Sequence, residues 1–185
     1  GHRYNTDFNG PEQCGVGAYQ VTHRHGERCS AAKAYLTPHL DRPNLQIVTH
    51  ALTTRVVTDL DENGVLRAVA VEYRGNGGRG PLQVLRLKAG GEVVLSAGAF
   101  GSPQLLMLSG IGPAGHLREH GIRVVHDQPG VGANLQDHRE IYMQFASKLP
   151  ITLYKYWNLW GKALIGAQWL FTGKGLGASN QFESC

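Results

Sequence analysis

The feature that most constrains the fold is a short apolar run at residues 92–96, followed by the small residues Ala97-Gly98-Ala99. A strand buried on both faces, as in a parallel sheet covered by helices, carries such a run instead of an alternation of polar and apolar residues. In open α/β sheets, ligands bind beyond the carboxyl ends of the strands, and small residues there allow a ligand to approach the backbone closely. The run therefore predicts a buried parallel strand that ends at a ligand site.

The residues before this run have the pattern of antiparallel strands. Alternating segments are separated by turn residues, and Asp61-Glu62-Asn63-Gly64 is typical of a hairpin. These strands should form an antiparallel meander. They are predicted at residues 45–49, 52–58, 65–73 and 84–87, with a glycine-rich turn at residues 75–80.

Helices are predicted where a capping residue precedes a segment with helical spacing. Ser30 and Ser102 are the expected N-terminal caps, Pro103 suits the first helical position, and Gly121 suits a helix end. The predicted helices are residues 31–36, 103–108, 114–120 and 157–171, and two further strands are predicted at residues 122–126 and 140–147.

Composition describes a globular chain that is not expected to bind nucleic acid. The 185 residues are 42% hydrophobic and 17% charged, and the net charge of +4 comes from scattered basic residues instead of a basic stripe. Three cysteines without a CxxC pair fit a reducing compartment. The chain opens without a Met or a signal peptide and ends in a strand-like segment, so we expect a non-secreted piece of a longer protein.

Two glycine-rich segments match GxGxxG but lack its structural context. A phosphate-binding version needs a strand before it and a helix after it. Residues 75–80 lie between two predicted strands and are interpreted as a hairpin turn. Residues 110–115 precede a predicted helix but also follow one, so neither segment is interpreted as a phosphate-binding motif. The nine histidines include no HExxH and no His pair near clustered carboxylates, so no metal site is predicted. No GxSxG motif is present, which argues against a hydrolase.

One segment resembles a known family signature. Residues 98–112, Gly-Ala-Phe-Gly-Ser-Pro-Gln-Leu-Leu-Met-Leu-Ser-Gly-Ile-Gly, satisfy the fixed positions of the second signature of the glucose–methanol–choline (GMC) oxidoreductases. Residues 26–36, 42–45 and 129–138 are similar to other blocks of that family, in the same order. The resemblance covers nearly the whole chain.

The resemblance implies an α/β to α+β protein with FAD as cofactor. The chain would carry the middle of a Rossmann-like FAD-binding domain, including the antiparallel meander, and the start of an antiparallel-sheet substrate domain. The implied parts are a loop-rich segment at residues 1–29 that packs on the substrate domain, part of the FAD-binding domain at residues 30–139, and the start of the substrate domain at residues 140–185.

Seven residues are implied to lie near the FAD. Thr53 stands where a backbone contact to the adenine is expected, although it could equally be an ordinary strand residue. Asp137 and His138 could instead be a turn cap and a surface group. The implied cofactor residues are Thr53, Ser96, Ala97, Gly98, Asn134, Asp137 and His138.

The last part of the chain resembles the choline-oxidising members of the family, so choline is the expected substrate. Glu140, two residues after His138, would face the trimethylammonium group, and Trp160 would form an aromatic wall. A quaternary ammonium donates no hydrogen bond and is held by charge and aromatic faces. Glu140 could instead face solvent and Trp160 could belong to a core. The family's catalytic His belongs to a C-terminal segment that this chain lacks, so no catalytic residue is assigned.

Two other functions stay open. One is oxidation of uncharged alcohols by a related dehydrogenase, and the other is a non-catalytic binding or scaffold role of a decayed domain. The interpretation as an enzyme implies an alcohol substrate and an electron acceptor of unknown identity. The expected location is the cytoplasm or a peripheral position on the inner membrane.

Overall fold

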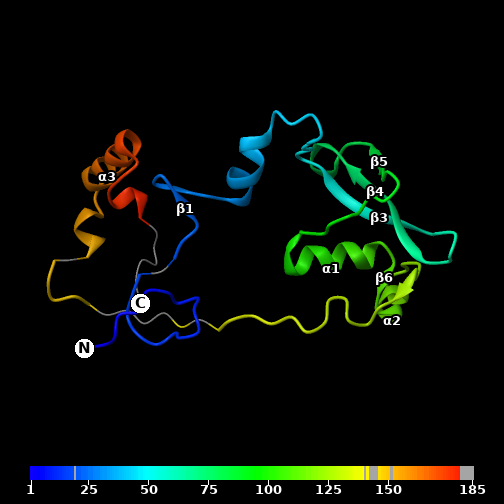
Figure 1. Cartoon of the computed structure of the whole chain (residues 1–185), viewed down its shortest axis with the longest axis horizontal. Helices are drawn as coiled ribbons and strands as arrows, with labels where there is room; N and C mark the ends of the chain where they lie inside the picture. Colours follow the sequence, from blue (N-terminus) through cyan, green and yellow to red (C-terminus); the bar gives the residue numbers. More distant parts are fainter. Residues whose placement is uncertain (19, 140, 142–145, 151, 180–185) are drawn as a thin grey trace. The chain divides into compact units, whose positions relative to one another are not determined.

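The computed structural model describes residues 1–18, 20–139, 141, 146–150 and 152–179. The backbone forms two compact units, and their relative placement is not determined (Figure 1). One unit is Gln46–Ile141, and the other combines Gly1–Leu45 with Tyr142–Cys185. The predicted boundaries after residues 29 and 139, which divide the chain into a loop-rich segment and parts of two domains, stay a prediction.

The central sheet of Gln46–Ile141 is the predicted antiparallel meander. Strands β3 (Leu52–Leu60), β4 (Leu66–Arg74) and β5 (Leu82–Arg86) are hydrogen-bonded in that order. Val56 and Ala70, only 6% and 1% exposed, are the buried apolar residues of the sheet. The strand predicted at residues 45–49 is wrong, because those residues pair with no described strand.

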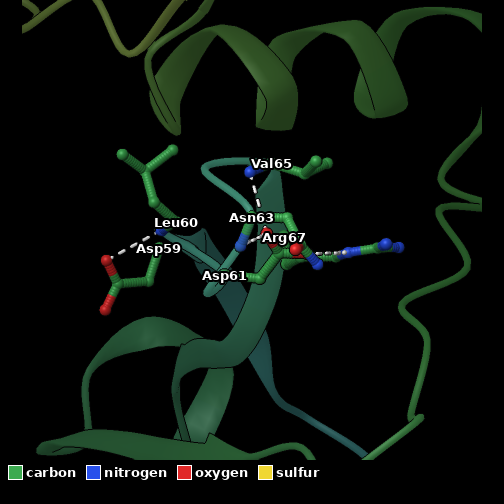
Figure 2. Close-up of polar contacts among 6 residues, drawn as sticks. All are labelled: Asp59, Leu60, Asp61, Asn63, Val65 and Arg67. Atoms are coloured by element: carbon green, nitrogen blue, oxygen red, sulfur yellow. Dashed lines mark hydrogen bonds and ion pairs between the residues drawn. The ribbon is translucent and has the colours of Figure 1, made fainter.

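The β3–β4 turn is closed by the side chain of Asp61. One carboxylate oxygen accepts hydrogen bonds from the backbone N–H of Asn63 and Val65, both at 2.9 Å, and the other accepts one from Arg67 Nε at 3.1 Å (Figure 2). The hydrogen bond from Val65, followed by that from Arg67, lowers the pKa of Asp61. Gly64 adopts a φ of +74°, which a residue without Cβ reaches without strain.

Two helices and a short parallel strand pair complete this unit. Helix α1 (Gly98–Leu108) is followed by β6 (Ile111–Gly112), α2 (Ala114–Glu119) and β7 (His126–Asp127), and β6 pairs with β7 in parallel. The helix predicted at residues 114–120 is confirmed. Residues 122–125 of the predicted strand are irregular, and only His126 belongs to β7.

Helix α1 begins four residues before the predicted cap, Ser102. The Ser102 Oγ instead accepts a hydrogen bond from the backbone N–H of Ala97, at 3.0 Å. Pro103 lies inside the helix, where it lacks only one backbone donor. The prediction placed the start too late because it took a Ser-Pro pair for a helix start.

The apolar run at residues 92–96 is not a strand. Val94 is 81% exposed, and no described strand pairs with the run. A strand exists through hydrogen bonds to a neighbour, so an apolar run without one stays irregular. The prediction of a buried parallel strand at this place is therefore wrong for the described structure.

Ser109, directly after α1, joins the helix to the sheet. Its Oγ accepts a hydrogen bond from the backbone N–H of Val56 at 2.9 Å and donates one to the carbonyl of Leu105 at 2.6 Å. Ser109 is only 5% exposed. Because β3 is the edge strand, the outward N–H of Val56 would otherwise be a buried donor without a partner.

The other unit contains the longest helix, α3 (Leu159–Thr172). The side chain of Asn158 caps its start by accepting from Gly161 N at 2.7 Å, and Gly173 ends it in the left-handed region. The helix predicted at residues 157–171 is thus confirmed, whereas the strand predicted at 140–147 lies largely outside the described residues. The remaining elements of this unit are β1 (His23–Arg24), β2 (Glu27–Arg28), η1 (Ala32–Leu36), η2 (Thr37–His39), η4 (Leu153–Tyr156) and η5 (Leu176–Ala178).

The start of the short helix η1 and the glycine-rich turn at residues 75–80 agree with the sequence. Ser30 Oγ accepts a hydrogen bond from Lys33 N at 3.2 Å, as a capping residue does. Residues 75–80 form the β4–β5 connection, with the short turn η3 (Asn76–Gly78), whereas residues 110–115 contain β6 and the first two residues of α2. Among the described residues, no helix combines the length and the apolar character needed to cross a membrane.

Replacing Ser109 with Ala should destabilise the chain by about 1–3 kcal/mol, because the buried N–H of Val56 loses its acceptor. Urea unfolding measures the change. The matched control is Thr49→Ala, which removes an exposed hydroxyl from the same unit and should stay within about 0.5 kcal/mol of the wild type. Equal stability of the Ser109→Ala variant and the control would contradict the bridging role.

Removing the Asp61 carboxylate should destabilise the β3–β4 turn in a pH-dependent way. The lowered pKa means that the carboxylate stabilises the fold above the pKa of the unfolded chain and loses this effect as pH falls through the folded pKa. Unfolding midpoints of wild type and Asp61→Ala should therefore differ at pH 7 and approach each other as pH falls below the ordinary pKa of an aspartate. Asp61→Asn, which keeps one acceptor oxygen, should lie between them at pH 7, and a pH-independent difference would refute the assignment.

Candidate functional site

The start of α1 is an open, exposed turn made of small residues. Ser96, Ala97 and Gly98, three of the predicted cofactor residues, are all exposed. Gly98 has a φ of +84°, and a Cβ built on it meets no atom within 4 Å. The glycine is therefore required by the backbone conformation, while the space in front of it is free for a ligand.

The first amides of α1 are available to an anion. No side chain among the described residues caps the helix, and Ala97 N–H is the one amide here that Ser102 engages. The first N–H groups of a helix lack partners within it, and the helix dipole adds partial positive charge there. The helix of 11 residues thus presents a place where a phosphate or another anion can be bound.

The loop at residues 128–139 contains the next three predicted cofactor residues. It begins with two tight turns and packs on α1, because a Cβ on Gly132 would lie 3.5 Å from Met107 Cε and 3.9 Å from Pro103 Cβ. Asn134 adopts a φ of +56°, and Asp137 accepts a hydrogen bond from the backbone N–H of His138 at 2.8 Å. Asn134, Asp137 and His138 are all exposed, so α1 supports a loop whose polar side chains are free to meet a ligand.

Thr53 lies near the start of β3, the strand against which α1 packs. It is half-buried and its Cα is paired with that of Tyr73, next to an irregularity in the register before Arg55. The C-terminal end of α1 lies beside the later part of β3, through Ser109 and Val56. The structure therefore places the predicted cofactor residues in one unit and on elements that adjoin α1.

Of the two predicted substrate residues, only Trp160 lies within the described residues. Glu140 lies outside the described residues. Trp160, in α3 of the other unit, is 84% exposed and so does not belong to the core of the described part of that unit. Its ring is accessible, as an aromatic wall for a cation must be.

A cavity of about 770 Å³ lies in the unit that contains α3. The ring N–H of Trp169, in its lining, donates a hydrogen bond to the carbonyl of Gly26 at 2.7 Å, which ties α3 to the β1–β2 turn. The size is within the range of small-molecule sites. Trp160 is not in its lining, which consists of Val21, Thr22, His23, Gly26, Glu27, Arg28, Trp169, Gly177, Ala178 and Ser179.

Ser102 and Trp169 hold these elements through hydrogen bonds that the sequence does not reveal. A Ser before Pro predicts a helix cap, and the bond of Ser102 to the residue before α1 has no signature of its own in the sequence. Trp169 lies among apolar residues at helical spacing, and its contact with Gly26 spans 143 residues. The described residues gather no group of three or more His, Cys, Asp or Glu side chains able to hold a metal ion.

A family model described as GMC oxidoreductase matches residues 1–140. An oxygen-dependent choline dehydrogenase of Rhizobium meliloti (strain 1021) is 49% identical over all 185 residues, which are 32% of its own length. The chain thus spans about a third of the length of the curated relatives it matches.

Solved structures show the same backbone arrangement. An FAD-dependent oxidoreductase from Chaetomium thermophilum is 25% identical with a TM-score of 0.74, covering 92% of this chain and 29% of its own. A formate oxidase is 24% identical with a TM-score of 0.77, covering 99% of this chain and 30% of its own, and supports the fold. The predicted fold class and family are confirmed, and the chain belongs to the GMC oxidoreductase family.

Proposed function

We propose that this chain is part of an FAD-dependent enzyme that oxidises a primary alcohol, choline, to betaine aldehyde. The main support is its 49% identity, over its whole length, to a protein named oxygen-dependent choline dehydrogenase. The relative is about three times as long, so the activity belongs to the complete parent protein and not to these residues alone.

The residues present fit a flavin dinucleotide. The amides of Gly98, Ala99 and Phe100 at the start of α1 suit a phosphate, and the open space before Gly98 leaves room for a bulky group. Ser96, Ala97, Asn134, Asp137 and His138 would lie along the cofactor, with Thr53 making its backbone contact to the adenine. When bound, FAD supplies the hydride acceptor, and the chain's own residues hold and orient it.

Glu140 and Trp160 are the proposed contacts to the cationic end of the substrate. A carboxylate attracts the trimethylammonium group by charge, and an indole face attracts it through the ring quadrupole. The trimethylammonium group undergoes no reaction, so these two residues would act by positioning the alcohol carbon for hydride loss.

Two other functions compete with this proposal. A dehydrogenase of the same family that acts on uncharged alcohols would use the same cofactor residues without needing Glu140. A non-catalytic scaffold would need neither the cofactor residues nor Glu140. A parent protein that binds no flavin would favour the scaffold function. The substrate and the electron acceptor therefore have to be established on the parent protein.

Location belongs to the same proposal. We place the parent in the cytoplasm or peripherally on the inner membrane. The exposed apolar side chains of Leu170 and Phe171, 70% and 82% exposed and followed by Lys174, would suit a membrane surface. Fractionation of cells that express the parent decides between the two locations.

Replacing Gly98 with Ala in the parent should lower its flavin content several-fold, because the left-handed backbone at the start of α1 becomes strained and the amides are displaced. Absorbance at the flavin band relative to protein measures the content. Gly64→Ala is the matched control, since Gly64 also has a positive φ, +74°, and also meets nothing within 4 Å, but lies in the β3–β4 turn. Equal flavin loss in both variants would mean that backbone strain alone causes the loss, and would contradict a specific role of Gly98 in flavin binding.

Replacing Glu140 with Gln in the parent should remove the preference for choline over its uncharged isostere 3,3-dimethylbutan-1-ol. The loss of charge should lower kcat/KM for choline roughly 10- to 100-fold, about 1.4–2.8 kcal/mol, and leave the isostere nearly unchanged. Steady-state rates with an artificial electron acceptor measure both. If the two alcohols react alike in wild type and variant, the choline proposal fails while the family stands.

A further inference from the structure

Two histidines of α2 lie together on the surface of the unit Gln46–Ile141. His116 is in the helix and His120 follows its last residue, one helical turn later. The backbone N–H of His120 donates to the carbonyl of His116 at 3.3 Å, so the helical spacing continues through His120. The two rings meet edge to face, with centroids 4.6 Å apart and planes at 74°.

The helix backbone that carries the two rings is held in place by contacts that do not involve the rings. Leu117 is fully buried, and its carbonyl accepts a hydrogen bond from Ile122 N at 2.9 Å. Ala114 N donates to Asp127 Oδ1 at 2.9 Å, which attaches the start of the helix to β7. Both histidines are exposed, so neither ring is needed for this packing.

The charges nearby suit a cation between the rings. Arg118 lies two residues after His116 and two before His120, and residues at that spacing do not share a helix face. Glu119 lies three residues after His116, on adjoining surface, and the carboxyl end of a helix carries partial negative charge. The described residues contain no group of three or more metal-binding side chains, so the pair offers only two protein ligands. The other coordination positions of a bound ion would be open.

We propose that His116 and His120 form a two-ligand surface site for a late divalent transition metal, such as Ni²⁺, Zn²⁺ or Cu²⁺. Imidazole suits these ions, and two histidines four residues apart on one helix face can bind the same ion. Water or another molecule completes the coordination sphere. The site lies apart from the start of α1 and does not depend on the proposed FAD chemistry.

Titration of the 185-residue chain with Ni²⁺ in a calorimeter tests the site. Once one imidazole holds the ion, the second binds it within the same molecule. Wild type should therefore bind one Ni²⁺ ion at least about tenfold more tightly than a variant that lacks either ring. His116→Gln and His120→Gln should each lose this tighter binding. Circular dichroism should show unchanged folding, since both side chains are exposed.

Two controls separate the pair from the other histidines. His50→Asn removes an exposed histidine of the same unit, at a φ of +53° that Asn tolerates, and should bind Ni²⁺ as wild type does. The double variant Arg118→His with His120→Gln keeps two histidines in α2 on different faces and should not restore the tight binding. Wild-type affinity in His120→Gln, or equal loss in His50→Asn, would overturn the proposal.

Discussion

The arrangement of Gln46–Ile141 depends on the bridge that Ser109 makes between α1 and β3. An edge strand exposes backbone donors that must find partners when a helix covers them. One hydroxyl solves this by accepting from Val56 N, so the buried donor is not left unpaired, and it also donates to the Leu105 carbonyl. The C-terminal end of α1 is thereby attached to the middle of β3.

This attachment has consequences at both ends of α1. At its end, Gly110 follows at a φ of +87° and accepts from Val125 and His126 at 2.8 and 3.1 Å, which brings β7 beside β6. At its start, the exposed amides and Gly98 form the turn that we propose binds the cofactor. Leu105 and Ser109 near the anchored end are buried, whereas Ser96, Ala97 and Gly98 at the start of the helix are exposed.

Sequence patterns located most elements because those elements depend on nearby residues. The hairpin turn at residues 61–64 forms through hydrogen bonds from Asn63 and Val65 to Asp61, within four residues. The α3 cap at Asn158 is equally local. The candidate cofactor residues, by contrast, came from resemblance to a family, since an exposed Ala or Gly has no chemical signature of its own.

The sequence by itself determined the meander, most of the helices and the family. These depend on short-range spacing and on turn residues. Only the tertiary structure decided that residues 92–96 stay irregular, that α1 starts at Gly98, and that Ser109 joins helix to sheet. For residues 92–96 and for Ser109, the physical reason is that a strand needs a hydrogen-bonded neighbour and a buried donor needs an acceptor, and both partners come from parts of the chain far away in sequence.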